Sequence, residues 1–306
     1  MTIASSIFHS ASSTEGMSIE TSDFVIIQSE GASFPELMNV ATELEHFLCF
    51  LCVGPVRGDR IVLKLDNGKS AELLWQLGKP VERTAFTIMP HQILVPLGSA
   101  PKFAKQALEK WFDANDATRL ARWLIVDALF TEESSTAKFL SVAQAWEIAG
   151  REESTVTPYN KTKFSEMRKE VEKIIKEKLG DAAAMRLVQL ISSSNRESFP
   201  DFVKNVIRKL PQPALDRICG DVSEFVRTVG RVRNVLTHME GTKQMPMETA
   251  AYLSLLLTYK LLVLFCIHAC VLMGLPLDNL PMMLLNNRMA RWAIRPLPKL
   301  SSVQPV

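Results

Sequence analysis

The spacing of hydrophobic positions divides the chain into two parts that differ in the periodicity of their apolar residues. Near the N-terminus, the apolar run FVIIQ (24–28) predicts a short strand. Ser33 and Glu36 follow at capping-box spacing, which predicts the start of a helix that Gly54-Pro55 ends. Alternating residues on either side of Asn67-Gly68 then predict a β-hairpin, because Asn-Gly favours the type I′ turn.

From Pro101 to Leu297 the three-to-four-residue spacing of helices replaces strand alternation. We therefore place a boundary near residue 99, which predicts a smaller α/β region over residues 1–98 and a helical domain over residues 99–306. The expected fold class is mainly α, a helical bundle preceded by an α/β region with a β-hairpin. The helices are expected at residues 102–114, 117–131, 136–152, 161–179, 182–193, 199–209, 213–238, 247–274 and 278–293.

The composition indicates a globular protein but does not identify a binding partner. Apolar residues make up 47% and charged residues 22% of the chain, which is typical of a packed globular protein. The formal net charge of +2 gives no global attraction to nucleic acid, so a polyanion site requires local clustering. The five cysteines and the absence of a secretory signal in the Ser-rich opening predict buried thiols in a cytoplasmic protein. We expect that opening, residues 1–16, to lack regular structure.

The segment 251–275 is long and apolar enough to raise the question of a membrane span. Lys260 near its centre would cost roughly 2.5 to 3.5 kcal/mol on insertion, and Tyr259 and His268 add to that cost. We therefore expect a buried core or dimer-interface helix and no membrane.

The stretch 218–238 carries the most informative cluster of polar residues. Its apolar residues recur at steps of three and four and form a complete core-facing stripe. On the opposite side Arg227, Arg231, Asn234 and His238 line up at helical spacing, with Arg233 on the flank. The sequence therefore predicts a basic cluster that contains one imidazole.

These residue types suit cleavage of an RNA phosphodiester by its own 2′-hydroxyl group. A histidine can act as general base or acid near neutral pH without a metal. Guanidinium groups fork onto phosphate oxygens, so Arg233 could stabilise the transition state while Arg227 or Arg231 holds the RNA backbone. Asn234 could orient the imidazole or the 2′-hydroxyl group. The alternative to a catalytic role is a structural one, in which His238 caps the end of the helix and the arginines are solvated.

Other chemistry finds no support in the sequence. There is no Asp or Glu cluster with metal-ligand spacing, no Gly-rich phosphate loop, no G-x-S-x-G elbow and no H-E-x-x-H pair. We expect no metal and no cofactor. The charged segment 163–179 is interpreted as a solvated helix face whose lysines could also steer RNA.

The stretch RNVLTH, from Arg233 to His238, resembles the motif of the HEPN superfamily, in which an Arg, a polar residue and a later His recur. In that family a Glu and a basic residue, separated by three residues, lie on an earlier helix; Glu147 and Arg151 have this spacing. Over about residues 34–290 the chain is similar to the ApeA-type HEPN proteins of bacterial antiphage defence. Those proteins have a longer N-terminal domain, so residues 1–98 correspond to its C-terminal part.

The resemblance implies a symmetric homodimer that brings both motifs to one cleft and cuts RNA without a metal, leaving a 2′,3′-cyclic phosphate. The resulting hypothesis is an endoribonuclease that acts as a toxin or antiphage effector, with Arg233, Asn234 and His238 as catalytic residues and Glu147 and Arg151 as supporting residues. The alternative is a non-catalytic HEPN-like helical dimer that serves as a regulatory module or binds RNA or protein.

Overall fold

The computed structural model describes residues 2–12, 18–28, 33–56, 61–64, 70–73, 90–96, 101–131, 135–153, 160–193, 198–243 and 245–298. The chain divides into two compact units, one of residues 1–48 and 56–75 and one of residues 49–55 and 76–306. The sequence-based boundary at residue 99 differs from this division. The last residues of the first helix belong to the larger unit, because Leu51 accepts a hydrogen bond from the backbone of Leu94 at 2.8 Å.

The smaller unit contains two antiparallel strand pairs and most of a helix. Strands β1 (Thr2–Ser12) and β2 (Ser18–Gln28) pair along their whole length, and β3 (Ile61–Lys64) pairs with β4 (Ser70–Leu73). Helix α1 (Phe34–Cys52) begins with the predicted capping box, since the Ser33 backbone donates to Glu36 Oε2 at 2.7 Å. The turn at Asn67-Gly68 lies outside the described residues.

The expectation of an irregular opening is wrong. Residues 2–12 form β1, because β2 supplies backbone hydrogen-bond partners along eleven residue pairs, from Thr2 with Gln28 to Ser12 with Ser18. A Ser-rich composition does not reveal such a pairing, and the strand predicted over residues 24–28 is the end of the longer β2.

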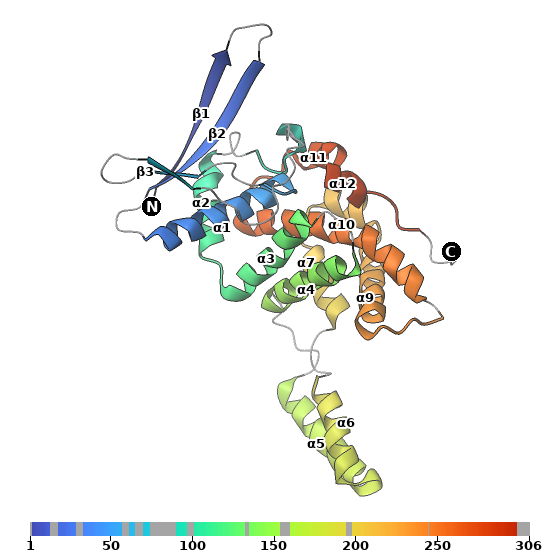
Figure 1. Ribbon diagram of the computed structural model, residues 1–306. Coiled ribbons are helices and arrows are strands. Elements are labelled where there is room, and N and C mark those ends of the chain that lie inside the picture. The colour runs from blue at the N-terminus through green and yellow to red at the C-terminus, as the bar shows by residue number, and fades with distance from the viewer. Residues whose placement is uncertain are drawn as a thin grey trace. The chain divides into compact units, whose positions relative to one another are not determined.

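The larger unit confirms the prediction of a mainly helical fold (Figure 1). Its helices match most of the predicted spans to within two residues. They are α2 (Pro101–Phe112), α3 (Asp116–Phe130), α4 (Thr136–Glu153), α5 (Lys161–Leu179), α6 (Asp181–Ser193), α7 (Phe199–Ile207), α8 (Gln212–Ala214), α9 (Val222–His238), α10 (Met247–Met273), α11 (Leu280–Asn286) and α12 (Arg288–Ala293). A short 3-10 turn, η1 (Pro90–Gln92), precedes them.

The helix predicted over residues 213–238 is interrupted. The short α8 continues into a π-helical turn, η3 (Leu215–Cys219), and Gly220 then adopts a positive φ of 64°. Asp221 starts α9 as its N-cap, since its side chain accepts a hydrogen bond from the Glu224 backbone at 2.9 Å. Apolar periodicity continues across this break, so the pattern alone did not reveal it.

The helix predicted over residues 278–293 is also two helices. Asn287 separates them and caps α12 by accepting hydrogen bonds from the backbones of Met289 and Ala290. Its amide nitrogen donates to the carbonyl oxygens of Cys52 and Gln92 at 2.9 and 3.0 Å. One side chain thus satisfies four backbone groups, which helix spacing does not disclose.

Helix α10 is the core of the bundle and contacts α2, α3, α4, α9 and α12 (Figure 1). Among the described residues, α10 is the one helix whose length and composition would allow it to cross a membrane. The buried core helix of a soluble protein also meets these two criteria. In this protein 72% of its most apolar window is buried. The position of α10 in the bundle therefore agrees with the expected core helix.

The Lys260 ammonium group lies inside this core. Its Nζ donates to the carbonyl oxygens of Ile218 at 2.8 Å and Ala293 at 2.6 Å. Burial lowers the pKa of Lys260 to about 8. The amine therefore stabilises the ends of η3 and α12 at the cost of desolvation.

We predict that the stability of the protein relative to Lys260→Met increases by about 2 kcal/mol between pH 8 and pH 10. A lysine whose pKa is lower in the folded state than in the unfolded state disfavours folding at low pH. That penalty declines as pH rises from about 8 towards the ordinary value of 10.5. Urea unfolding of both proteins at several pH values measures the difference, from which the titration of other groups largely cancels. A pH-independent difference would contradict a lowered pKa of Lys260.

Candidate functional site

Helix α9 presents one buried and one exposed side, as its sequence predicts. Val229 and Val232 are fully buried against the bundle, and Phe225 and Leu236 extend the same stripe. Arg227, Arg231, Asn234 and His238 are exposed. His238 is the last residue of the helix, and Met239 ends it in the left-handed conformation with a φ of 54°.

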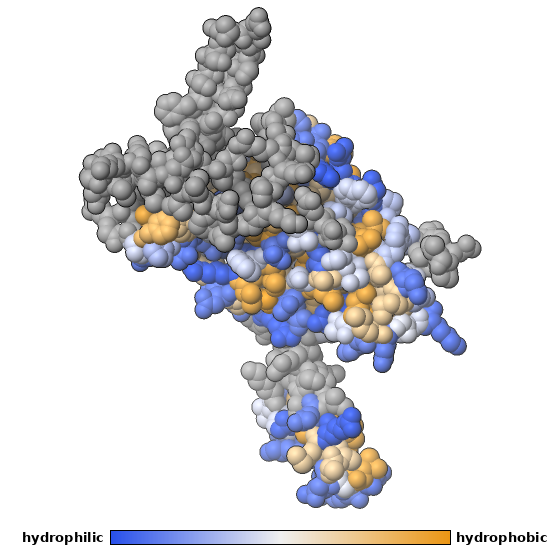
Figure 2. Space-filling model, viewed as in Figure 1, coloured by the Kyte–Doolittle hydropathy of each residue, from blue (hydrophilic) through white to orange (hydrophobic). Residues whose placement is uncertain are grey.

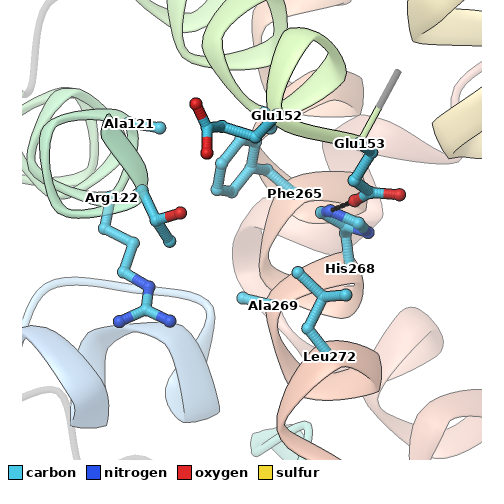
Figure 3. Close-up of a pocket in the computed structure, with 10 residues that line it drawn as sticks. Ala121, Arg122, Glu152, Glu153, Phe265, His268, Ala269 and Leu272 are labelled. Carbon is cyan, nitrogen blue, oxygen red and sulfur yellow. Dashed lines mark ion pairs between the residues drawn. The ribbon is translucent and has the colours of Figure 1, made fainter. Parts of the chain in front are cut away.

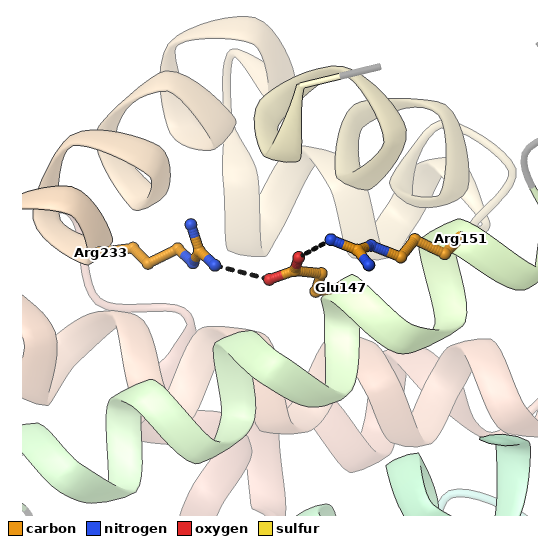
Figure 4. A network of polar contacts seen from close by, with 3 residues as sticks. All are labelled: Glu147, Arg151 and Arg233. Carbon is orange, nitrogen blue, oxygen red and sulfur yellow. Dashed lines mark hydrogen bonds and ion pairs between the residues drawn. The ribbon is translucent and has the colours of Figure 1, made fainter. Parts of the chain in front are cut away.

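Arg233 leaves α9 on the side that faces α4. Its Nη2 donates to Glu147 Oε2 at 2.6 Å, and the other carboxylate oxygen, Oε1, pairs with Arg151 one turn further along α4 (Figure 4). The Arg233 guanidinium also lies over the Phe199 ring, 4.9 Å from its centroid. One carboxylate therefore joins two guanidinium groups from different helices.

This ion-pair network is only partly open to solvent. The Glu147 side chain is 18% exposed and that of Arg233 is 29% exposed, whereas that of Arg151 is 62% exposed. Partial burial strengthens the pairing of Glu147 with Arg233 relative to a surface pair and fixes the guanidinium in one direction. The Arg233 side chain is thus pre-positioned rather than free to rotate.

The other predicted site residues lie on the neighbouring exposed side of α9. Arg227 pairs with Glu224 on the same helix at 2.5 Å. His238 lies five positions after Arg233, so their side chains leave the helix in directions about 140° apart. The structure therefore brings Arg233, Glu147 and Arg151 together, and it places Asn234, His238, Arg227 and Arg231 along the adjacent surface.

A second polar cluster joins the ends of α4 and α7 to α10. His268 Nε2 lies 2.8 Å from Glu153 Oε1 (Figure 3). Lys209 Nζ lies 2.6 Å from Glu153 Oε2. Burial alone would raise the pKa of the Glu153 carboxyl, but hydrogen bonds from His268 and Lys209 lower it to about 2. The buried His268 ring stacks on Trp146, whose indole N–H donates to the Leu261 carbonyl at 3.1 Å.

The cavity beside this cluster measures about 60 Å³, well below the roughly 300 Å³ at which small-molecule pockets begin. It is lined by Glu152, Glu153, His268 and apolar side chains of α3 and α10. Within the described ranges, no group of three or more His, Cys, Asp or Glu side chains is placed to hold a metal ion. We interpret the Glu153 cluster as a structural link between three helices.

Sequence reasoning found Glu147 and Arg233 but missed their neighbours. Phe199 under the Arg233 guanidinium carried no motif signal, and Glu153 and His268 meet across 115 residues of sequence. Among the tryptophans, Trp111 and Trp146 are buried in the core, whereas Trp123 is 60% exposed and Trp292 is 38% exposed. All five cysteines are free, and Cys49, Cys266 and Cys270 are buried.

A helical bundle in which a Glu-x-x-x-Arg pair on one helix meets the Arg of an Arg-Asn-His motif on another has the features of a HEPN domain. Residues 140–278 match the family described as Apea-like HEPN. The matched range contains Glu147, Arg151 and the whole stretch from Arg233 to His238. Comparison with curated proteins and with solved structures gives no match. HEPN domains are generally associated with ribonucleases.

Proposed function

We propose that the protein is a metal-independent endoribonuclease that acts as a toxin or antiphage defence effector, with Arg233, Asn234 and His238 at its active site. The observation that carries the proposal is the partly buried Glu147–Arg233 ion pair, which fixes the guanidinium of one motif residue on the helix that also exposes Asn234 and His238. A phosphodiester needs such a fixed positive charge together with a group that can transfer protons.

The proposed reaction uses the substrate's own nucleophile. A base removes the proton from the 2′-hydroxyl group, the 2′-oxygen attacks the adjacent phosphorus, the bond to the 5′-oxygen of the next nucleotide breaks, and an acid gives a proton to that leaving 5′-oxygen. His238 transfers one of these protons, while Arg233 stabilises the negative charge that develops on the phosphoryl oxygens. Asn234 orients the imidazole or the 2′-hydroxyl group. The products are a 2′,3′-cyclic phosphate and a free 5′-hydroxyl group.

The proposed active unit is a homodimer. Within one copy Arg233 and His238 leave α9 in directions about 140° apart, so one phosphate is reached more easily by the Arg233 of one copy and the His238 of another. A two-fold axis near the end of α9 would create two such pairs at once. Arg227 and Arg231, exposed on the same helix, would bind the flanking RNA backbone.

Incubation of the purified protein with structured and single-stranded RNA in excess EDTA tests this proposal. Cleavage products that end in a 2′,3′-cyclic phosphate are expected, and expression of the wild type in a bacterium should slow growth and fragment total RNA. RNA binding without cleavage would instead support the non-catalytic alternative. Activity that requires an added metal ion would contradict the mechanism.

We predict that Glu147→Gln lowers the cleavage rate by roughly tenfold, which corresponds to the loss of a charge-assisted hydrogen bond. Glutamine keeps the size of the side chain but can no longer hold Arg233 and Arg151 by charge. Glu224→Gln is the matched control, because Glu224 also pairs with an α9 arginine but the pair is exposed. Equal losses in the two variants would argue that the Glu147 pairing has no special role.

A further inference from the structure

Helix α12 carries a surface tryptophan whose ring is covered by a guanidinium group. The Arg295 Cζ lies 3.5 Å from the centroid of the Trp292 ring, and Trp292 is 38% exposed. Because this is the contact distance of two stacked planes, the guanidinium lies flat on the ring rather than edge-on. Trp292 also stacks on Tyr259 of α10, with centroids 5.8 Å apart and an angle of 22° between the planes. Tyr259, Trp292 and Arg295 thus form one connected group, the α12 stack.

The helix that carries the α12 stack is held at both ends by buried polar side chains. Asn287 caps its first turn by accepting backbone hydrogen bonds. Lys260, the residue after Tyr259 on α10, donates to the carbonyl oxygen of Ala293 at 2.6 Å. The stack is therefore in place before any ligand binds, which lowers the entropic cost of binding.

The two arginines at this surface have no acidic partner. Arg291 lies one turn before Arg295, and both side chains are exposed. Neither forms an ion pair with any residue that the structure describes. In the sequence, no acidic residue follows Asp278. The charges of both guanidinium groups are therefore available to a ligand.

The neighbouring elements add little negative charge. Helix α11, on which α12 packs, contains no charged residue. The acidic residue of α10 is Glu248, which lies eleven positions before Tyr259, about 16 Å along the helix axis. On η3, whose end Lys260 joins to α12, Asp216 stands beside Arg217. The surface around the α12 stack is therefore positively charged and attracts an anion.

A flat guanidinium with a second one a helical turn away is suited to a nucleotide. An unpaired nucleobase stacks on the flat face of an arginine, and a phosphate accepts hydrogen bonds from another. Bases in a duplex are covered by their neighbours, so a single strand fits better than a double one. Attachment to a membrane would need an apolar face, whereas the visible surface over α12 is mainly hydrophilic (Figure 2).

We propose that Arg291, Trp292 and Arg295 form a binding site for single-stranded RNA that is separate from the proposed active site. One base stacks on the outer face of the Arg295 guanidinium, which the Trp292 ring supports from below. Arg291 binds a neighbouring phosphate. The inference rests on the proposed function in that RNA is the ligand, and it adds a second place at which the substrate is held.

A further aromatic side chain shows where the bound strand leads. Tyr252 is 50% exposed and lies seven positions before Tyr259, on the same side of α10 and about 10 Å nearer to the start of that helix. Helix α10 begins nine positions after His238 and packs on α9. A strand that continues from the α12 stack past Tyr252 therefore runs toward the end of the motif helix.

Fluorescence anisotropy with a short labelled single-stranded RNA at about 0.15 M salt tests the site. The full chain carries His238→Ala so that the RNA stays uncut. We expect Trp292→Ala to raise the dissociation constant about 10-fold to 100-fold, which corresponds to the loss of one stacked base. Arg295→Lys keeps the charge but loses the flat face, so it should raise the constant about 5-fold. Arg291→Gln should weaken the salt dependence by about one phosphate contact.

Trp123→Ala is the matched control for Trp292→Ala. Trp123 is more exposed, at 60% against 38%, but among the described residues no cation lies over its ring. Its replacement should leave the dissociation constant unchanged. Trp292→Phe retains a ring and should keep most of the affinity. Circular dichroism and urea unfolding of each variant separate a lost contact from a lost fold.

Three results would overturn the inference. The first is a dissociation constant that neither Trp292→Ala nor Arg295→Lys changes. The second is an equal loss in Trp292→Ala for single-stranded and duplex RNA, because stacking requires an unpaired base. The third is flotation with phosphatidylglycerol vesicles that Trp292→Ala abolishes while RNA binding is unaffected.

Cleavage by the chain with an intact His238 distinguishes this inference from the proposed function. Trp292→Ala should raise the half-saturating RNA concentration by the factor found in the binding assay and leave the maximal single-turnover rate unchanged. Cleavage with an unchanged half-saturating concentration in this variant removes the inference alone. A chain that binds RNA through Trp292 but cuts none removes only the proposed function.

Discussion

Replacement of His238 by alanine should lower the rate of RNA cleavage by about 10² to 10⁴-fold while the fold stays intact. His238 is exposed at the end of α9, so its side chain contributes little to the core and the variant should unfold like the wild type. The rate is measured with a labelled RNA under single-turnover conditions in EDTA. His91→Ala is the matched control, because His91 is also exposed and belongs to η1 rather than to the motif helix. An unchanged rate in His238→Ala would remove the imidazole from the mechanism.

A mixture of two inactive variants tests whether the site is shared between copies. In a dimer of His238→Ala with Arg233→Ala, one copy supplies an intact Arg233 and the other an intact His238. If each reaction uses the arginine of one copy and the histidine of the other, the mixed dimer regains one working pair, and cleavage should recover to a large fraction of one site. Lack of recovery in a verified mixed dimer would mean that each copy uses its own Arg233 and His238.

Gly150→Ala should destabilise the protein by about 1 to 3 kcal/mol. In an exposed helix this substitution is expected to stabilise by roughly 1 kcal/mol, because alanine is the better helix former. At Gly150 the new Cβ would overlap the ring of the buried Phe202, and two further ring atoms would lie at 3.0 and 3.1 Å. The close approach of α4 to α7 at this point therefore reverses the expected sign. Urea unfolding followed by circular dichroism measures the change.

A double-mutant cycle with Phe202→Leu identifies the cause. The smaller side chain removes the ring that the new methyl group meets, so Gly150→Ala should cost much less, or even stabilise, in that background. Equal costs in both backgrounds would locate the strain elsewhere. Because Gly150 lies between Glu147 and Arg151, and Phe202 lies on the same helix as Phe199, Gly150→Ala should also lower the cleavage rate by disturbing the pairing with Arg233.

The sequence predicted the part of the candidate site that depends on residue chemistry. Arg233, Asn234 and His238 were recognisable because their spacing and types match a known motif, and Glu147 with Arg151 because an earlier helix carried the expected pair. The structure adds the direct ion pair between Glu147 and Arg233. The catalytic roles of these residues are proposals that the variants above will test.

The remaining features depend on tertiary packing that no local pattern encodes. From the sequence alone, Phe199 is indistinguishable from an ordinary core residue. Its ring lies beneath the Arg233 guanidinium only because α7 packs against α9. The positions of most helices could be predicted from the periodicity of apolar residues. The break before α9, however, depends on the positive φ of Gly220. The Gly220-Asp221 pair, with Glu224 three residues later, was the available signal for that break.

The two carbonyl groups bound by Lys260 also determine how far α10 can move. A rotation of α10 by one residue turns its side chains by about 100°, and an axial shift by one residue moves them about 1.5 Å, so either movement would pull the ammonium group away from at least one of its two acceptors. The amine therefore holds the central helix in a single register against η3 and α12. Because α9 packs on α10, the same constraint sets the height at which the motif helix, and the imidazole at its end, meets any second copy of the chain.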